Sequence, residues 1–172
     1  MIPGDGTMAK LRAVYDVNMK VMALIPLGTV LVELGRETYS GIPVPMTPDR
    51  KEGDGKRVES LLDAVPDPEV KKAMQKQLRG ISRKHAVLSL WGDETQLMDA
   101  GSRNGVLVRG GGIGGADKKL AEGEKFPLRN GMIFTLGAWP LQFFDVPEDI
   151  EKLKNSTPRV YPMVDEPPLF QS

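Results

Sequence analysis

The sequence contains no cysteine and only one histidine in 172 residues. It can therefore form no disulfide, and neither a His/Cys metal site nor a Cys–His catalytic pair can be built from it. Lysine plus arginine and aspartate plus glutamate number 23 each, so the formal net charge is zero. Because nucleic-acid and membrane binders usually have a basic bias, this balance argues against both as partners. The lack of cysteine also fits a cytoplasmic protein.

Long apolar runs are missing as well. No segment approaches the roughly 20 apolar residues that cross a bilayer, and residues 1–10 lack the apolar stretch of a signal peptide. We expect residues 1–10 to be a flexible N-terminus. The chain does have 40% hydrophobic residues, which is enough for a packed core. Its length fits one domain with extensions.

Features of common enzyme sites are absent or incomplete. The glycine-rich segment 110–115, GGGIGG, is reminiscent of a nucleotide-binding loop, but no Lys-Ser/Thr helix start follows it. It joins two strand-like regions, so a flexible hairpin loop is the better interpretation. Ser82 or Ser102 could form a triad with His85 and Asp99, but neither serine lies in a G-x-S-x-G turn. We therefore expect a binding protein without cofactor or metal, and not an enzyme.

Short apolar runs separated by turn residues indicate a mainly β fold. Three of these runs, 86–91, 95–99 and 106–109, are predicted to form a meander. The complete set of expected strands is Leu11–Val17, Lys20–Ile25, Thr29–Leu34, Ala86–Trp91, Thr95–Asp99, Val106–Arg109, Phe126–Leu128, Met132–Leu136 and Leu141–Val146.

Residues 37–81 interrupt this pattern. Residues 39–55 are rich in proline, glycine and charge and predict a mobile loop, and two helices follow at 57–65 and 68–79. Asp67 is the expected N-cap of the second helix, whose apolar stripe faces away from Lys71, Lys72, Lys76 and Arg79. These helices either form a hairpin packed on the sandwich edge with a solvated basic face, or a flap that helps to select a partner.

Two polar turns, at 82–85 and 101–105, lead directly into strands. Together they carry two hydroxyls, two guanidiniums, one ammonium and one amide, and Arg36 joins them from upstream. Such a set of donors suits an oxyanion. For each charged residue alone, a solvated surface side chain is the plainer interpretation.

Four short motifs lie on these turns in a fixed order, and they resemble the forkhead-associated (FHA) domain. The resemblance runs from Leu11 to Val146. It implies an antiparallel β-sandwich of about eleven strands, in which 37–81 is a helical insert before the second motif. It also implies binding of phosphothreonine peptides without chemistry. The motifs are Gly35-Arg36, Ser82-Arg83-Lys84-His85-Ala86, Asp99-Ala100-Gly101-Ser102-Arg103-Asn104-Gly105 and Leu128-Arg129-Asn130-Gly131, with a closing Gly137.

The resemblance implies a role for each matched polar residue. Arg36 and the Ser82 hydroxyl would hold the phosphate, with Arg83 or Lys84 assisting. Asn104 would hold the peptide backbone in an extended form.

Other matched residues would support the site, and two depart from the family. Gly35, His85 and Gly105 are expected to be structural, with the histidine bracing the loops. Arg103 stands where the family commonly has a small hydroxyl residue, so it either adds to the phosphate grip or fills the pocket. Val106 replaces a frequent threonine.

Two functions follow from the resemblance. The first is an adaptor that recognises phosphothreonine on protein partners of Ser/Thr-kinase signalling, downstream of such a kinase. The alternative is a phosphate-independent interaction module that uses the helical insert.

The segment 147–172 is expected to be a Pro-rich tail with a turn or two of helix near its start. Within it, Thr157 followed by Val160 could serve as a phosphosite that a second copy binds head to tail. An ordinary disordered tail is the alternative.

Overall fold

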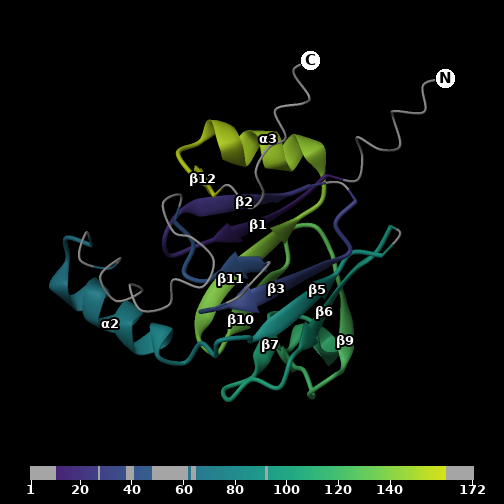
Figure 1. Ribbon diagram of the computed structural model, residues 1–172, viewed down its shortest axis with the longest axis horizontal. Coiled ribbons are helices and arrows are strands. Elements are labelled where there is room, and N and C mark those ends of the chain that lie inside the picture. Colours follow the sequence, from purple (N-terminus) through teal and green to yellow (C-terminus); the bar gives the residue numbers. More distant parts are fainter. Residues whose placement is uncertain are drawn as a thin grey trace.

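The computed structural model describes residues 11–26, 28–37, 41–47, 62, 65–91 and 93–161. These residues form a sandwich of two β-sheets (Figure 1). The strands are β1 (Arg12–Asp16), β2 (Val21–Ile25), β3 (Leu31–Gly35), β4 (Gly41–Pro43), β5 (Ala86–Ser89), β6 (Thr95–Asp99), β7 (Val106–Val108), β8 (Lys118–Lys119), β9 (Lys125–Leu128), β10 (Ile133–Leu136), β11 (Trp139–Phe144) and β12 (Arg159–Tyr161). One sheet has the order β12-β2-β1-β11-β10-β7-β8, and the other has the order β4-β3-β5-β6-β9.

The predicted β-sandwich is confirmed, and alternation along its strands fills the core. In β11, Trp139, Leu141 and Phe143 are fully buried, whereas the residues between them are half-buried. This is the period of two expected when one face of a strand meets the opposite sheet. The strand pairs are antiparallel except β3 with β4 and β12 with β2, which are parallel.

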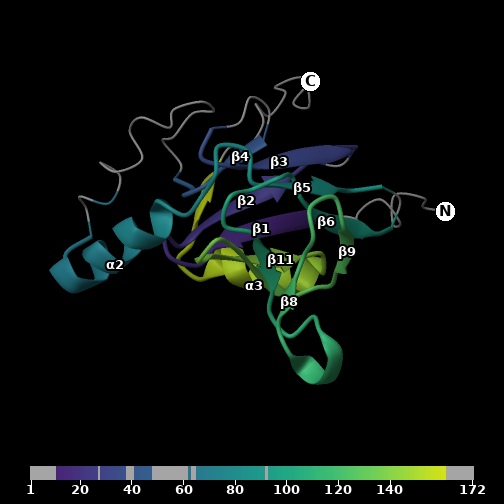
Figure 2. The same cartoon turned by 90° about the horizontal axis from the view of Figure 1, so that it is seen from below.

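The prediction that three consecutive strands form a meander is wrong for the third strand, β7. β5 pairs with β6, but β7 pairs with β10 and β8 in the other sheet. The chain crosses between the sheets in the turn at 100–105. Alternation of apolar residues identifies a strand but does not specify its partner, because both sheets of a sandwich bury one face of each strand. The glycine-rich segment does form the predicted loop between β7 and β8, and it projects from the sandwich (Figure 2).

The segment 147–161, which was expected to belong to a Pro-rich tail, contains a helix and a strand. The expected helix is α3 (Pro147–Asn155), which lies over the outer face of the larger sheet (Figure 1). There its buried Ile150 packs with Ala13 and Met22. β12 was not predicted, and it adds a strand to the edge of the same sheet. Residues 162–172 of the expected tail lie outside the described residues.

The prediction of a mobile loop at residues 39–55 is also wrong in part. β4 pairs with β3, and Ile42, Val44 and Met46 are fully buried. Burial of these three alternating apolar side chains favours a strand here, although the neighbouring prolines favour a loop. Of the helix expected at 57–65, only residues 62 and 65 are described, and the N-terminus at 1–10 also lies outside the described residues.

The second predicted helix is present as α2 (Pro68–Leu78). It begins at the predicted N-cap, where the Asp67 carboxylate accepts from the Glu69 N–H at 2.9 Å. Met74 and Leu78 are buried in the core, but Val70 is 46% exposed. Only the C-terminal half of the apolar stripe therefore packs on the sandwich, and the helix extends away from it (Figures 1 and 2).

A buried carboxylate links the insert to the core. Asp16, at the end of β1, accepts hydrogen bonds from the Met46 N–H at 2.9 Å and the Met19 N–H at 3.1 Å. It also accepts from the indole N–H of buried Trp139 at 3.0 Å. Burial raises the pKa of Asp16 to about 6, against the lowering effect of these donors. The apolar pattern of β1 gave no signal of this residue's role.

Candidate functional site

Three separate segments meet at one end of the sandwich. The end of β3 packs against the turn after α2, because the Arg36 N–H donates to the Ser82 carbonyl at 3.0 Å and the Glu37 N–H to the Arg83 carbonyl at 3.0 Å. A Cβ at Gly35 would lie 2.0 Å from the Arg83 carbonyl oxygen. This close approach explains why glycine precedes Arg36.

The turn at 100–105 is held by side-chain acceptors. Buried Asp99 accepts from the N–H groups of Gly101 and Ser102 at 2.9 and 2.8 Å. The Ser102 hydroxyl accepts from the Gly105 N–H at 2.9 Å. Gly101 and Gly105 have φ of +91° and +86°, conformations that other residues adopt only with strain. Side chains 103 and 104 thereby stand exposed at the tip of the turn.

His85 joins these two turns from beneath. Its Nδ1 accepts from the Ser82 N–H at 2.9 Å. Its Nε2 must then carry the proton, and it donates to the Gly105 carbonyl at 2.7 Å. The ring is fully buried, and burial lowers the pKa of His85 below its ordinary value, which favours this neutral form. The ring therefore connects the two turns through one hydrogen bond to each.

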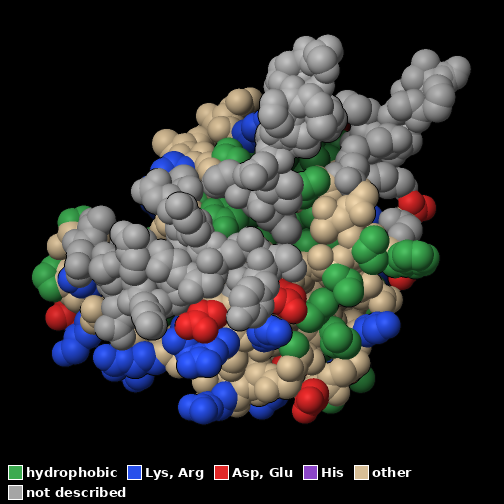
Figure 3. Space-filling model, viewed as in Figure 1, with side chains coloured by type: hydrophobic (Ala, Val, Ile, Leu, Met, Phe, Trp, Pro, Cys, Tyr) green, Lys and Arg blue, Asp and Glu red, His purple; other side chains and the backbone are tan. Residues whose placement is uncertain are grey.

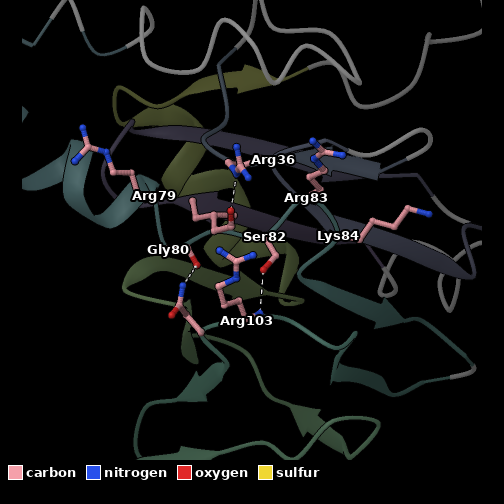
Figure 4. A pocket seen from close by; sticks show the side chains of 9 residues that line it. Arg36, Arg79, Gly80, Ser82, Arg83, Lys84 and Arg103 are labelled. Carbon is pink, nitrogen blue, oxygen red and sulfur yellow. Dashed lines mark hydrogen bonds between the residues drawn. The ribbon is translucent and has the colours of Figure 1, made fainter.

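The three segments enclose a pocket of about 440 Å³ (Figure 4). All six side chains expected to bind a phosphopeptide line it. Three further residues line it that were not predicted: Arg79, Gly80 and Ile81. Among the residues that the structure describes, the lining is Arg36, Arg79, Gly80, Ile81, Ser82, Arg83, Lys84, Arg103 and Asn104.

Hydrogen bonds orient the side chains around this pocket. Arg36 donates from Nε to the Ile81 carbonyl at 2.5 Å. The Ser82 hydroxyl accepts from the Arg103 N–H at 3.1 Å. In Figure 4 the side chains of Arg36 and Arg103 approach each other around Ser82, whereas Arg79 lies on the α2 side. The pocket therefore brings several cationic side chains together with one hydroxyl.

The lining is strongly basic. It contains four arginines and one lysine, and no carboxylate belongs to it among the residues described. Arg83 and Lys84 contact acids outside the pocket, Glu37 at 3.6 Å and Glu33 at 3.9 Å. Such exposed pairs are weak and readily exchanged. The arrangement suits a compact dianion with several acceptor oxygens.

Arg79 and Gly137 contribute to the site, although neither was predicted as a binding or supporting residue. Arg79 reaches the pocket only because α2 ends beside it, and its place in a predicted basic helix face was the one available hint. Gly137, in the turn between β10 and β11, has φ of +62°, and a Cβ there would lie 2.7 Å from the Gly80 carbonyl oxygen. This glycine therefore lets the β10–β11 turn close against the end of α2.

Other kinds of site are not seen in the described part of the chain. No group of three or more His, Cys, Asp or Glu side chains there could hold a metal ion. Within the same residues, no helix is both long and apolar enough to cross a membrane.

Comparisons with known proteins concern the family and the fold of the chain. Residues 71–137 match the family model of the FHA domain. The solution structure of the FHA domain of an Arabidopsis thaliana hypothetical protein has a TM-score of 0.51 at 14% identity, covering 81% of this chain and 89% of that one. It supports the fold. A comparison with curated proteins found no match.

Two further solved structures are similar at lower scores. Mycobacterium tuberculosis EmbR, in complex with a low-affinity phosphopeptide, has a TM-score of 0.49 at 14% identity and 79% coverage of this chain. The chain spans only 24% of the length of EmbR. The FHA domain of the Chlamydia trachomatis protein CT664 has a TM-score of 0.46 at 16% identity, covering 78% of this chain and 96% of that one. Residues 71–137 thus match the family model of the FHA domain, and the sandwich has the fold of that domain.

Proposed function

We propose that this chain binds phosphothreonine on partner proteins, with the phosphate held in the basic pocket. The observation that supports the proposal is that five cationic side chains and one serine hydroxyl from three segments line one pocket, without a carboxylate among the described lining residues. A phosphothreonine has nearly two negative charges at neutral pH and three strong acceptors, so the pocket is complementary to it.

Each side chain has a defined task in this proposal. Arg36 and the Ser82 hydroxyl bind the phosphate, and Arg103 adds a second guanidinium near them. Arg83 and Lys84 contribute positive charge at the rim, because their side chains are 75% and 57% exposed. Asn104 holds the peptide backbone next to the phosphate.

The energetics fit reversible binding. A charge-assisted hydrogen bond contributes about 1.5–3 kcal/mol. Three such bonds, reduced by the cost of ordering the peptide, give a dissociation constant on the order of micromolar. The task needs no acid, base or cofactor, and we propose recognition without catalysis.

The finer parts of the proposal concern the partner. Phosphothreonine on intracellular proteins is made by Ser/Thr kinases, so we propose an adaptor that acts after such a kinase in the cytoplasm. Thr157 is exposed between α3 and β12, and Val160 lies within β12. If Thr157 is a ligand for a second copy, β12 must leave β2 so that the peptide can extend into the neighbouring pocket.

The test is a calorimetric titration of a phosphothreonine peptide library, and of the matched threonine peptides, into wild type and Arg36→Ala. Arg129→Ala is the control, because it removes an exposed arginine from the turn before β10, whereas the pocket adjoins the turn after this strand. Phosphate-dependent binding that Arg36→Ala weakens about 30-fold or more, and that Arg129→Ala leaves unchanged, supports the proposal. If no phosphopeptide binds, the phosphate-independent interaction module replaces it.

A further inference from the structure

The basic lining of the pocket continues along α2. Arg79 directly follows this helix and lines the pocket. Lys76 and Lys72 precede it by three and seven positions, a spacing that places all three side chains on one helix face. All three are exposed. Figure 3 shows lysine and arginine side chains gathered along α2 and onward toward the middle of the molecule. We name Lys72, Lys76 and Arg79 the α2 basic face.

The end of α2 is fixed relative to the pocket. On the opposite side of the helix, Met74 and Leu78 are buried in the main core. Gln77 accepts a hydrogen bond from the side chain of Asn18 at 2.9 Å, and the Gly80 carbonyl accepts one from Asn104 at 3.1 Å. Because these contacts come from three different parts of the fold, the α2 basic face has a defined position beside the pocket.

Within the described part of the chain, the structure gives no ion pair for the side chains of this face. The ion pairs that the structure gives for the described residues involve Arg83, Lys84, Lys118 and Lys154. None of them includes a member of the α2 basic face. Three cations on one face, without an acidic partner among the described residues, repel one another, so an anion bound there relieves this repulsion.

We propose that the α2 basic face binds a second anionic group on the same phosphothreonine peptide, either an acidic side chain or a second phosphate. The proposal rests on the proposed function, since it requires the first phosphate in the pocket. It adds a partner class, namely phosphothreonine segments with a further negative charge nearby.

The dimensions of helix and peptide set the spacing. A helix rises about 1.5 Å per residue, so Lys76 and Lys72 lie about 5 and 10 Å beyond Arg79 along the axis. An extended peptide advances about 3.3 Å per residue. The second anion is therefore expected about two to three residues from the phosphothreonine.

The expected gain is moderate. Exposed ion pairs are individually weak, so one acidic residue at the favoured position should tighten binding roughly threefold. A second phosphate, with nearly two charges, should tighten it about tenfold. Both gains should shrink as salt is raised from about 0.05 to 0.5 M, because the Debye length falls below the distances between exposed charges.

The test measures peptide binding by titration to wild type, to the double variant Lys72→Gln/Lys76→Gln and to the control Lys152→Gln/Lys154→Gln. The control makes the same charge change on exposed positions of α3. The peptides are one phosphothreonine peptide with neutral flanks, versions with glutamate or phosphoserine at the second or third position on either side, and their unphosphorylated threonine forms. A mixed-sequence 12-nucleotide single-stranded DNA is titrated in parallel.

We expect the glutamate and phosphoserine peptides to bind wild type and the α3 control more tightly than the neutral peptide. We expect Lys72→Gln/Lys76→Gln to lose this advantage while it binds the neutral phosphopeptide as wild type does. If the phosphoserine peptides alone gain, the second group is a phosphate; if both classes gain, acidity suffices.

Three results would overturn the inference. The first is equal wild-type affinity for neutral and anionic phosphopeptides, and the second is an advantage that persists in Lys72→Gln/Lys76→Gln. In both cases, binding that still depends on the phosphothreonine leaves the proposed function intact. The third is DNA binding as tight as that of the anionic phosphopeptides and lost in Lys72→Gln/Lys76→Gln, which would make the face a nucleic-acid surface. Failure of the proposed function is distinct, because then no phosphothreonine peptide binds at all.

Discussion

The side-chain amide of Asn104 donates a hydrogen bond to the carbonyl oxygen of Gly80 at 3.1 Å. This bond joins the turn after β6 to the end of α2. The same Asn104 lines the pocket and is proposed to hold the peptide. The insert and the peptide-binding turn are thus connected through one residue.

We predict that Asn104→Ala weakens phosphopeptide binding about tenfold, since it removes both the peptide contact and the tie to Gly80. Amide hydrogen exchange at Gly80 and Ile81 should become faster in the variant, because α2 loses one of its attachments. Asn155→Ala, at the exposed end of α3, should change neither quantity. Unaltered exchange at Gly80 and Ile81 would show that this bond does not hold the insert.

The Ser82 hydroxyl accepts from the Arg103 N–H, so its own proton remains available for a phosphate oxygen. Ser82→Ala should therefore weaken phosphopeptide binding by about tenfold or more. It should change the free energy of unfolding by less than about 1 kcal/mol, because the bond is exposed. Ser82→Thr keeps the hydroxyl and should recover most of the affinity. Equal losses in the two variants would argue against a hydroxyl–phosphate bond.

Gly35 lies too close to the Arg83 carbonyl for any side chain. Gly35→Ala should push the end of β3 away from the turn that carries Ser82, and lower the free energy of unfolding by about 2 kcal/mol or more. Gly114→Ala is the matched control, because nothing lies within 4 Å of its Cβ and only its φ of +68° opposes the change. Chemical denaturation measures both variants. A similar small loss in each would mean that the contact at Gly35 relaxes without cost.

Asp16 predicts a pH dependence of stability. Its pKa is about 6 in the folded protein against an ordinary 3.8, so between these values the folded state holds more protons than the unfolded state. The contribution of Asp16 to stability is therefore greatest below pH 3.8 and falls as the pH rises to about 6.

Urea denaturation of wild type and Asp16→Asn across this range isolates the effect, because the other titrating groups are shared. The free energy of unfolding of wild type minus that of the variant should fall by about 2 kcal/mol between pH 4 and pH 7. A difference that is constant or grows with pH would contradict a carboxyl that is neutralised by burial.

The local features of the site could be predicted from the sequence, because each depends on residues that are close together in the chain. The motifs at 35–36, 82–86 and 99–105 contain the glycines, the asparagine and the acid that their turns require. The N-cap at Asp67 and the alternation in β5 and β11 are likewise local, and the structure has both.

Long-range relationships could not be read in the same way. The pairing of β7 with β10, the parallel addition of β4 and β12, and the buried carboxylate of Asp16 all depend on residues far apart in the sequence. Arg79 belongs to the pocket for the same reason, because only the packing of Leu78 and the bond to Gly80 bring α2 there. The prolines around 43–45 favoured a loop, although the burial of Ile42 and Val44 prevails.

We propose that a phosphothreonine occupies the pocket between β3, the end of α2 and the turn after β6. The most direct test records the backbone amide NMR signals of ¹⁵N-labelled protein during titration with the tightest-binding phosphothreonine peptide from the library, and with its threonine form. We expect the phosphopeptide to shift the signals of Arg36, Ser82, Arg103 and Asn104 most strongly, and the threonine peptide to leave them in place. Equal shifts with both peptides, or phosphate-dependent shifts confined to another face, would contradict this proposal.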